Sequence, residues 1–407
     1  MPNALLTIQM ITNEALAVLE NELTFTKGVN RQYDDSFGRS GAKIGTTLNV
    51  RKPPQYIGRT GQAISIEDAV ETSIPLTLTT QRGVDISFSS QDLKLSIDDF
   101  SNRFIKPAMA NVANGIDVDG LIVATNSVFN SVGTPGTPLA DGTTLLTAGA
   151  LMDTFSTPRG SGLRSAVFNP FAAANVVGGL KSIFNNQDAI SNQYKTGNLG
   201  PLYGFKTSMD QNILNRVVGP LGGAPLVNGA AQTGNSLVTN GWTAAAALRL
   251  NKGDVFTIAN VFSVNAQSRQ STNVLQQFVV TANVSSDGAG NATIPISPAI
   301  VPAGVSDVYQ TVTASPASGA ALTVVGAANT VTTQNLAYHR DAFTLASADL
   351  PLPDGVDWAA RKSDPQTGLS VRMIRQYNIT TDQWPCRLDV LYGWAPLYPQ
   401  WACRIQA

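Results

Sequence analysis

The chain has 407 residues, of which only 14% are charged, and 27 basic residues against 28 acidic ones leave a net charge of −1. This balance excludes a general electrostatic grip on nucleic acid. A surface so poor in charge is a solubility risk for a free monomer, and is easier to understand if much of it lies against neighbouring molecules. The composition therefore favours a protein that assembles, with a secreted β-rich protein coated in Ser, Thr and Asn as the alternative.

Length and the absence of targeting signals further narrow the class of protein to which the chain can belong. The length suggests two or three domains. The first residues lack the basic start of a signal peptide, and no run of about 18 apolar residues predicts a membrane span. Cys386 and Cys403 are too few for a disulfide framework, so we predict reduced, buried thiols that act as small apolar side chains.

The first 40 residues predict a helical arm. Apolar residues recur at spacings of three and four, at Leu5, Ile8, Ile11, Ala15, Leu16, Leu19 and Leu23. Gly28 ends this pattern, and a polar stretch follows up to Gly41. We interpret residues 1–40 as an arm that need not belong to the core of its own subunit.

Residues 41–95 predict an extended loop with flanking strands. Apolar residues alternate in four runs, which end near Val50, Ile66, Leu78 and Phe88. Between the first two runs lie Lys52-Pro53-Pro54, Gly58 and Gly61, which suit a long hairpin with an irregular tip. A two-stranded excursion has little core of its own, so it would need a neighbouring subunit to hold it.

Residues 96–221 predict a long helix followed by an α+β body. The helix has an apolar face from Phe100 to Val123, with Ser96 or Asp98 as its cap and a kink or junction at Pro107. The body then predicts helices at 147–157 and 170–184 around a strand at 165–168.

The composition changes at about Pro220. Residues 222–335 hold almost no helix signal, and predict short strands at 247–250, 255–258, 277–284, 293–296, 309–312 and 322–325. Asn228-Gly229, Asn240-Gly241 and Asp287-Gly288 predict turns between them. We interpret this stretch as an independent β-sandwich or small barrel inserted into a parent domain that resumes over residues 336–407.

The C-terminal end is the most informative segment. Thr380 to Ile405 holds three of the five Trp and two of the nine Tyr, and offers almost nothing for acid-base chemistry. Such aromatic residues bury much apolar surface, although chain ends are usually frayed. The segment therefore predicts a tail that completes a core or an interface.

Catalytic and metal chemistry find little support. The one histidine, His339, predicts a polar contact in a turn, and no Cys and His spacing suits a metal. The paired carboxylates Asp34-Asp35, Asp98-Asp99 and Asp117 with Asp119 predict helix capping and solvation. The glycine-rich stretch at 219–223 lacks the Lys-Ser/Thr of a phosphate loop. We expect no catalytic residue, no cofactor and no metal.

One basic group is a candidate contact site. Arg51, Lys52 and Arg59 lie with Tyr56 near the predicted hairpin tip. Contact with acidic residues of a neighbouring subunit is the favoured interpretation. Free solvation and nucleic acid remain alternatives, the latter weakened because three charges make a poor patch.

Three longer segments carry a family resemblance: Lys252 to Ile258 (KGDVFTI), Asn335 to Phe343 (NLAYHRDAF) and Asp382 to Ile405. With the order of parts described above, the chain resembles the major capsid (coat) protein of short-tailed, lambdoid-type bacteriophages. The resemblance implies the Johnson fold, the α+β Hong Kong-type shell fold, with an N-terminal arm, an extended β-hairpin loop, a long spine helix, and a telokin-like, Ig-like β-domain inserted in a peripheral and axial body.

The resemblance also implies a function and partners. The chain would form pentamers and hexamers of an icosahedral virion shell, assembled in the bacterial cytoplasm on a scaffolding protein with a portal. The shell would expand as double-stranded DNA is packaged against its inner surface without sequence specificity. No membrane contact is implied, and a decoration protein is left open. Some related shells are crosslinked between Lys and Asn, but we predict a non-covalent shell, because no catalytic Glu or target Asn can be assigned to Lys52. A secreted adhesin or surface-layer protein remains the competing class, disfavoured by the missing signal peptide and the long helix.

Overall fold

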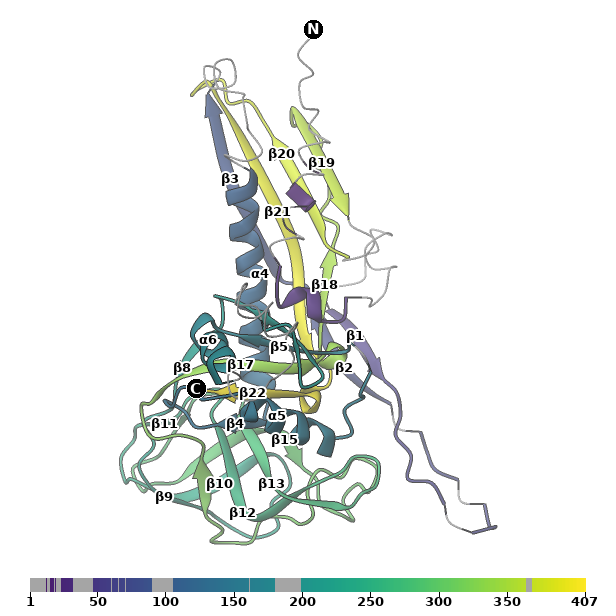
Figure 1. Cartoon of the computed structure of the whole chain (residues 1–407), viewed down its shortest axis with the longest axis vertical. Helices are drawn as coiled ribbons and strands as arrows, with labels where there is room; N and C mark the ends of the chain where they lie inside the picture. The colour runs from purple at the N-terminus through teal and green to yellow at the C-terminus, as the bar shows by residue number, and fades with distance from the viewer. Residues whose placement is uncertain are drawn as a thin grey trace. The chain divides into compact units, whose positions relative to one another are not determined.

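The computed structural model describes residues 12, 15–17, 19, 23–31, 47–59, 61–64, 66–69, 71–89, 105–160, 162–179, 199–363 and 368–407. The chain divides into two compact units (Figure 1). The first comprises residues 1–50, 73–120 and 343–395, and the second comprises 51–72, 121–342 and 396–407. No helix within the described residues is long and apolar enough to cross a membrane.

A five-stranded sheet forms the larger part of the first unit. Its strands are β3 (Thr80–Ser89), β18 (Phe343–Ala348), β19 (Trp358–Ser363), β20 (Ser370–Arg375) and β21 (Gln383–Pro396). The long β21 is its centre, because it pairs antiparallel with β20 on one side and with β3 on the other. The β3 pairing runs from Gln383 opposite Ser89 to Tyr392 opposite Thr80.

The long helix predicted from the sequence is present as α4 (Lys106–Ser127). Met109, Val112 and Ile116 of its apolar face are buried, as the spacing predicts. Pro107, where the sequence predicts a kink or a junction, is the second residue of α4, and Ile105 just before this helix has π-helical backbone. The predicted caps Ser96 and Asp98 lie outside the described residues, as do Asp34 and Asp35.

The end of the N-terminal arm belongs to the subunit's own core. Leu19 and Leu23 are buried, and the Phe25 ring stacks on Trp394 with 5.5 Å between ring centroids. The arm also includes a short 3-10 helix, η1 (Thr26–Gly28). The prediction allowed the arm to lie outside the core of its own subunit, but aromatic packing anchors this stretch of the arm in that core.

The capping interpretation of Asp117 and Asp119 is wrong. Both lie inside α4, and Asp117 is buried. Its carboxylate accepts backbone N–H groups of Thr24 (2.7 Å), Phe25 (3.2 Å) and Thr26 (3.0 Å), and also the Thr26 hydroxyl. These three amides do not pair in a strand, and the Asp117 carboxylate is their acceptor instead.

Asp119 performs a second structural role. Its carboxylate pairs with the Arg82 guanidinium at 2.9 Å, and the buried Tyr392 hydroxyl donates to it. Burial and this carboxylate raise the pKa of Tyr392 above its ordinary range, so the phenol stays protonated as a donor. The group connects α4 to β3 and β21.

A mixed sheet forms the body of the second unit. Its order is β4 (Ser131–Gly133), β22 (Ala402–Gln406), β17 (Val331–His339), β5 (Arg164–Phe168), β7 (Phe205–Met209) and β6 (Pro201–Leu202), with β8 (Asn215–Val217) also pairing with β17. Helices α5 (Thr143–Thr154) and α6 (Pro170–Gly179) bury apolar residues in the same core as Phe168, Cys403 and Ile405. The two predicted helices and the strand at 165–168 are thereby confirmed, with α5 beginning and ending earlier than expected.

The inserted region forms a second core. Its six-stranded sheet has the order β16 (Leu322–Val324), β12 (Val255–Val264), β13 (Ser271–Val280), β15 (Ala292–Ile300), β10 (Gly234–Trp242) and β9 (Gly223–Val227). Two short strands, β11 (Leu248–Leu250) and β14 (Val284–Ser285), pair beside it. Phe256 and Phe278 stack within the apolar core at 5.8 Å between centroids.

Three predictions in the strand pattern are wrong. Asn240-Gly241 is no turn but lies within β10 at a register irregularity, where Gly241 has φ +76° and a Cβ would meet the Ala224 carbonyl oxygen at 2.5 Å. Residues 309–312 form no strand, although Val312 makes an isolated bridge. Ile64 and Ile66 also lie outside any strand, in the irregular stretch between β1 (Thr47–Lys52) and β2 (Thr72–Thr77).

The two connections to the inserted region lie side by side. The Asn329 amide donates to the Gly219 carbonyl at 3.3 Å, and the Val218 amide donates to the Thr330 carbonyl at 3.0 Å. A segment whose ends meet can be inserted in a parent fold without distorting it. Residues 219–329 therefore have both a core and a closed base.

This geometry predicts that residues 219–329 fold alone. A fragment of this size buries between about 60% and 70% of its unfolded surface, which is enough for a marginal core. We expect a cooperative thermal transition by circular dichroism and dispersed amide resonances. The double change Phe256→Ala and Phe278→Ala is the matched control and should abolish both, whereas a non-cooperative wild-type fragment would contradict the boundary.

The C-terminal segment is built into both units. β21 lies in the first and β22 lies in the second, between β17 and β4. Trp384, Trp394 and Trp401 are each half-buried, and Trp401 stacks on Tyr398 with 4.2 Å between centroids. Cys386 and Cys403 are buried and unpaired, as predicted. The segment thus completes cores, in agreement with its aromatic content.

Candidate assembly site at the hairpin

A hairpin formed by β1 and β2 carries the candidate site. Its strands separate at Lys52 and rejoin at Thr72. Arg51 and Glu71 form an ion pair at 3.4 Å across this end, with both side chains largely exposed. An exposed pair contributes about 0–1 kcal/mol, so it does little more than align the strand ends.

Hydrogen bonds between side chains and the backbone of the loop hold the loop beyond the strands. The Glu67 carboxylate accepts the amides of Ile57 at 2.8 Å and Gly58 at 2.7 Å, and the Arg59 guanidinium donates to the Gly61 carbonyl. Gly58 and Gly61 have φ of +77° and +104°, which favour glycine. Local hydrogen bonds thus give the loop a shape without an apolar core.

Apolar side chains on this loop face solvent. Ile64 is 83% exposed and Ile66 is 88% exposed, and Tyr56 and Ile57 are about half exposed at 56% and 49%. Single exposed apolar residues are ordinary, whereas four on one loop favour a contact surface, and we call these four side chains the apolar patch.

The structure does not bring the four predicted contact residues together. Arg51 and Lys52 are the last residues of β1, whereas Tyr56 and Arg59 lie in the loop. The Lys52 ammonium lies 4.8 Å from the centroid of the Tyr398 ring, and burial lowers the pKa of Lys52 to about 8. Ile64 and Ile66 were not predicted as contact residues, because their alternation is typical of a strand.

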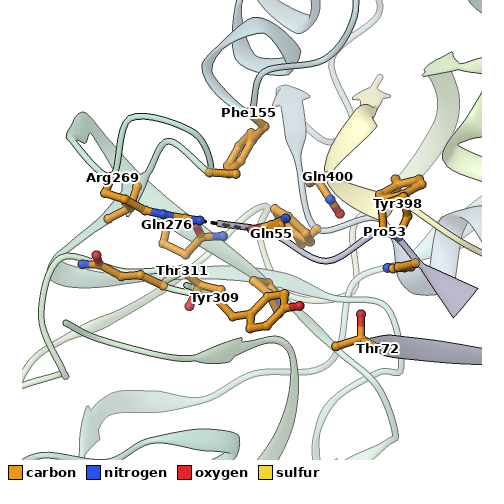
Figure 2. Close-up of a pocket in the computed structure, with 16 residues that line it drawn as sticks. Pro53, Gln55, Thr72, Phe155, Arg269, Gln276, Tyr309, Thr311, Tyr398 and Gln400 are labelled. Atoms are coloured by element: carbon orange, nitrogen blue, oxygen red, sulfur yellow. Dashed lines mark hydrogen bonds between the residues drawn. The ribbon is translucent and has the colours of Figure 1, made fainter. Parts of the chain in front are cut away.

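A cavity of 210 Å³ lies at the base of the hairpin, within the second unit (Figure 2). The hairpin contributes Lys52, Pro53 and Gln55 to its wall. The inserted region contributes Arg269 and Tyr309, and Figure 2 shows the hydrogen bond that joins Arg269 to Gln55 at 3.3 Å.

The segments that carried the resemblance meet in a buried polar network. Arg404 is fully buried, and its guanidinium donates to the Gly253 carbonyl at 2.9 Å. Asp254 pairs with Arg216 at 2.9 Å and accepts the Gly219 amide. Burial lowers the pKa of Arg404 to about 9. This network connects the inserted region to β22, and sequence reasoning missed it because an arginine at a chain end is usually solvated.

The lone histidine is also part of this packing. His339 ends β17, is buried, and lies edge-on to Trp401 with 5.3 Å between ring centroids. Its Nδ1 accepts the Asp341 amide at 3.2 Å, the predicted polar contact, and burial lowers its pKa. Across the described ranges, no three His, Cys, Asp or Glu side chains are grouped as a metal site.

A family comparison decides the identity. The family model described as P22 coat protein, gene protein 5, matches residues 2–403. The chain belongs to the P22 coat protein family. It is therefore the major capsid protein of a tailed phage, a structural and not an enzymatic protein that forms an icosahedral shell, and its place is the virion. Its fold is the α+β Hong Kong-type capsid fold with an inserted β-barrel-like domain.

Solved structures are similar to this coat protein at low identity. A chain of Mycobacterium phage Che8 is 10% identical, with 94% of this chain and 90% of that chain covered and a TM-score of 0.47. The bacteriophage PhiM1 mature capsid is 12% identical, with 93% and 88% covered and a TM-score of 0.42. The CUS-3 coat protein I-domain is 26% identical over 26% of this chain and 97% of that chain, with a TM-score of 0.20. Among curated proteins, no sequence matches the chain.

Proposed function

We propose that the coat protein assembles as pentamers and hexamers, and that the hairpin loop makes the contact between neighbouring subunits. The observation that supports this most is the apolar patch of Tyr56, Ile57, Ile64 and Ile66 on a loop with no core. A loop that reaches a different surface of the next subunit makes a heterologous contact, which closes into rings. Arg51 and Arg59 add cations around this patch for acidic residues of the neighbour.

The proposal extends to the assembly pathway that the family resemblance implies. A scaffolding protein would guide a procapsid, a portal would occupy one vertex, and the shell would expand as double-stranded DNA enters. The contacts with DNA would be non-specific and weak, because non-specific binding depends on basic side chains and the chain carries a net charge of −1. The shell would be non-covalent, because Lys52 lies against Tyr398 and the cavity.

The hairpin proposal predicts a separation of folding from assembly. The double change Ile64→Asp and Ile66→Asp replaces two exposed side chains, so the unfolding free energy should change by no more than about 0.5 kcal/mol per site. In a shell, every copy loses an apolar contact and buries charge, so particle yield should fall at least tenfold. Sucrose-gradient sedimentation measures the particles, and thermal unfolding measures the subunit.

A matched control keeps this result interpretable. In the control variant, Val305 alone is replaced by Asp in the otherwise wild-type chain; this residue lies in the inserted region and is 60% exposed. Normal particle yield in the control with a loss in the hairpin variant supports the proposal. Normal yield in both variants would show that the loop makes no assembly contact.

A further inference from the structure

The cavity at the hairpin base combines cations with aromatic walls. Among the residues that the structure describes, its lining includes Lys52 and Arg269 but no carboxylate. A cavity with two basic side chains and no acidic one has a positive potential, which its low-dielectric walls strengthen.

Arg269 is placed in this cavity by a built turn. It has φ +57°, a left-handed conformation that is strained for a non-glycine residue. The Asn265 side chain holds the turn, accepting the amides of Gln267 at 2.9 Å and Ser268 at 3.0 Å. The Arg269 amide donates to the Asn265 carbonyl at 3.0 Å, so the turn between β12 and β13 fixes this conformation.

The Arg269 guanidinium has a hydrogen-bond donor that no described residue uses. Its Nη2 donates to the Gln55 side-chain oxygen at 3.3 Å, whereas its Nε is buried and has no hydrogen-bond partner. A buried N–H without an acceptor is unfavourable, so an acceptor that enters the cavity is favoured. Guanidinium groups bind carboxylates more strongly than neutral acceptors.

The remaining walls suit a flat apolar body. Phe129 and Phe155 meet edge to face at 5.7 Å between centroids, and Val264, Pro298 and Tyr398 also line the space. In Figure 2, Arg269 and Tyr398 lie toward opposite ends of the cavity. A volume of 210 Å³ exceeds the about 150 Å³ of an engineered cavity that binds benzene, so it leaves room for one ring with one acidic group.

We propose that this cavity binds a small aromatic carboxylate, with the carboxylate on Arg269 and the ring between the aromatic walls, and with Lys52 adding positive potential at the other end. Such a ligand contacts both the hairpin base and the inserted region, so it would hold the hairpin in one orientation. Binding itself does not depend on the proposed assembly contact.

The test is titration calorimetry of benzoate into the full-length subunit at pH 7.5. We expect saturable binding with a Kd on the order of 1 mM, and binding at least tenfold weaker for benzamide, which keeps the ring but lacks the charge. Arg269→Met should weaken benzoate at least tenfold and Lys52→Met about threefold. Lys252→Met, which removes an exposed lysine outside the cavity, should leave the Kd unchanged.

A second readout guards against misfolded variants. Because burial lowers the pKa of Lys52 to about 8, a bound anion should raise it, and the wild-type chain should take up protons on binding benzoate near pH 8. Titrations in buffers of different ionisation enthalpy measure this uptake. Equal affinity for benzoate and benzamide, no saturation, or an unchanged Kd in folded Arg269→Met would overturn the proposal.

Discussion

Ending the chain at Thr381 should yield a subunit that aggregates or is degraded. The truncation removes β21, which pairs with strands on both sides, and β22, which lies between β17 and β4. It also removes Arg404, whose loss leaves the Gly253 carbonyl without this donor, and the Trp394 ring that covers Phe25. The stabilising free energy lost with central strands of two sheets far exceeds a typical unfolding free energy of about 5–15 kcal/mol.

The measurement is the soluble fraction after expression, followed by circular dichroism of whatever remains soluble. A chain that lacks Met1 to Asn13 is the control, and should stay soluble with altered assembly. A truncated chain that is monomeric and folded, together with an unfolded control, would mean that core and arm have been assigned to the wrong ends.

Replacing Asp117 by alanine should be among the most destabilising single changes. The variant leaves the buried amides of Phe25 and Thr26 and the half-buried amide of Thr24 without this acceptor. Each unsatisfied buried N–H costs about 1–3 kcal/mol, so we expect a loss of about 3–5 kcal/mol after local relaxation. Urea unfolding followed through tryptophan fluorescence measures it, because three of the five Trp lie in the first unit.

Asp119→Ala is the matched control on the same helix. The Asp119 carboxylate is 26% exposed and Arg82 is 38% exposed, so water replaces part of what is lost. We expect a loss of about 1–2 kcal/mol. If the two variants unfold at the same urea concentration, Asp117 does not anchor the N-terminal segment as described.

Periodic segments were predictable because one face is buried against one core. The apolar face of α4 and the strand β15 follow this rule. The strand β5 is buried at every position and was recognisable as a short apolar run. β10 was missed because one of its buried positions is polar. Thr239 is buried, donates to the Ala292 carbonyl at 2.8 Å and accepts the Trp242 indole N–H at 2.9 Å.

The polar elements of the site could not be predicted from the sequence. Nothing local distinguishes Asp117, whose partners lie more than 90 residues away, or Arg404, whose burial depends on the inserted region. Ile64 and Ile66 alternate like a strand, yet the Glu67 contacts fix an irregular loop that leaves them exposed. The contact role of the basic group at the hairpin stays a prediction, and the structure separates Lys52, at the end of β1, from Arg59 in the loop.

Electron microscopy with analytical sedimentation of the purified full-length protein tests the central claim most directly. The protein is produced alone and together with the scaffolding protein that we propose. Self-assembly through closing rings predicts closed shells of megadalton mass with the scaffold, which dissociate in denaturant without reducing agent because no covalent bond joins the subunits. Small, monodisperse particles of one or a few subunits under both conditions would contradict it.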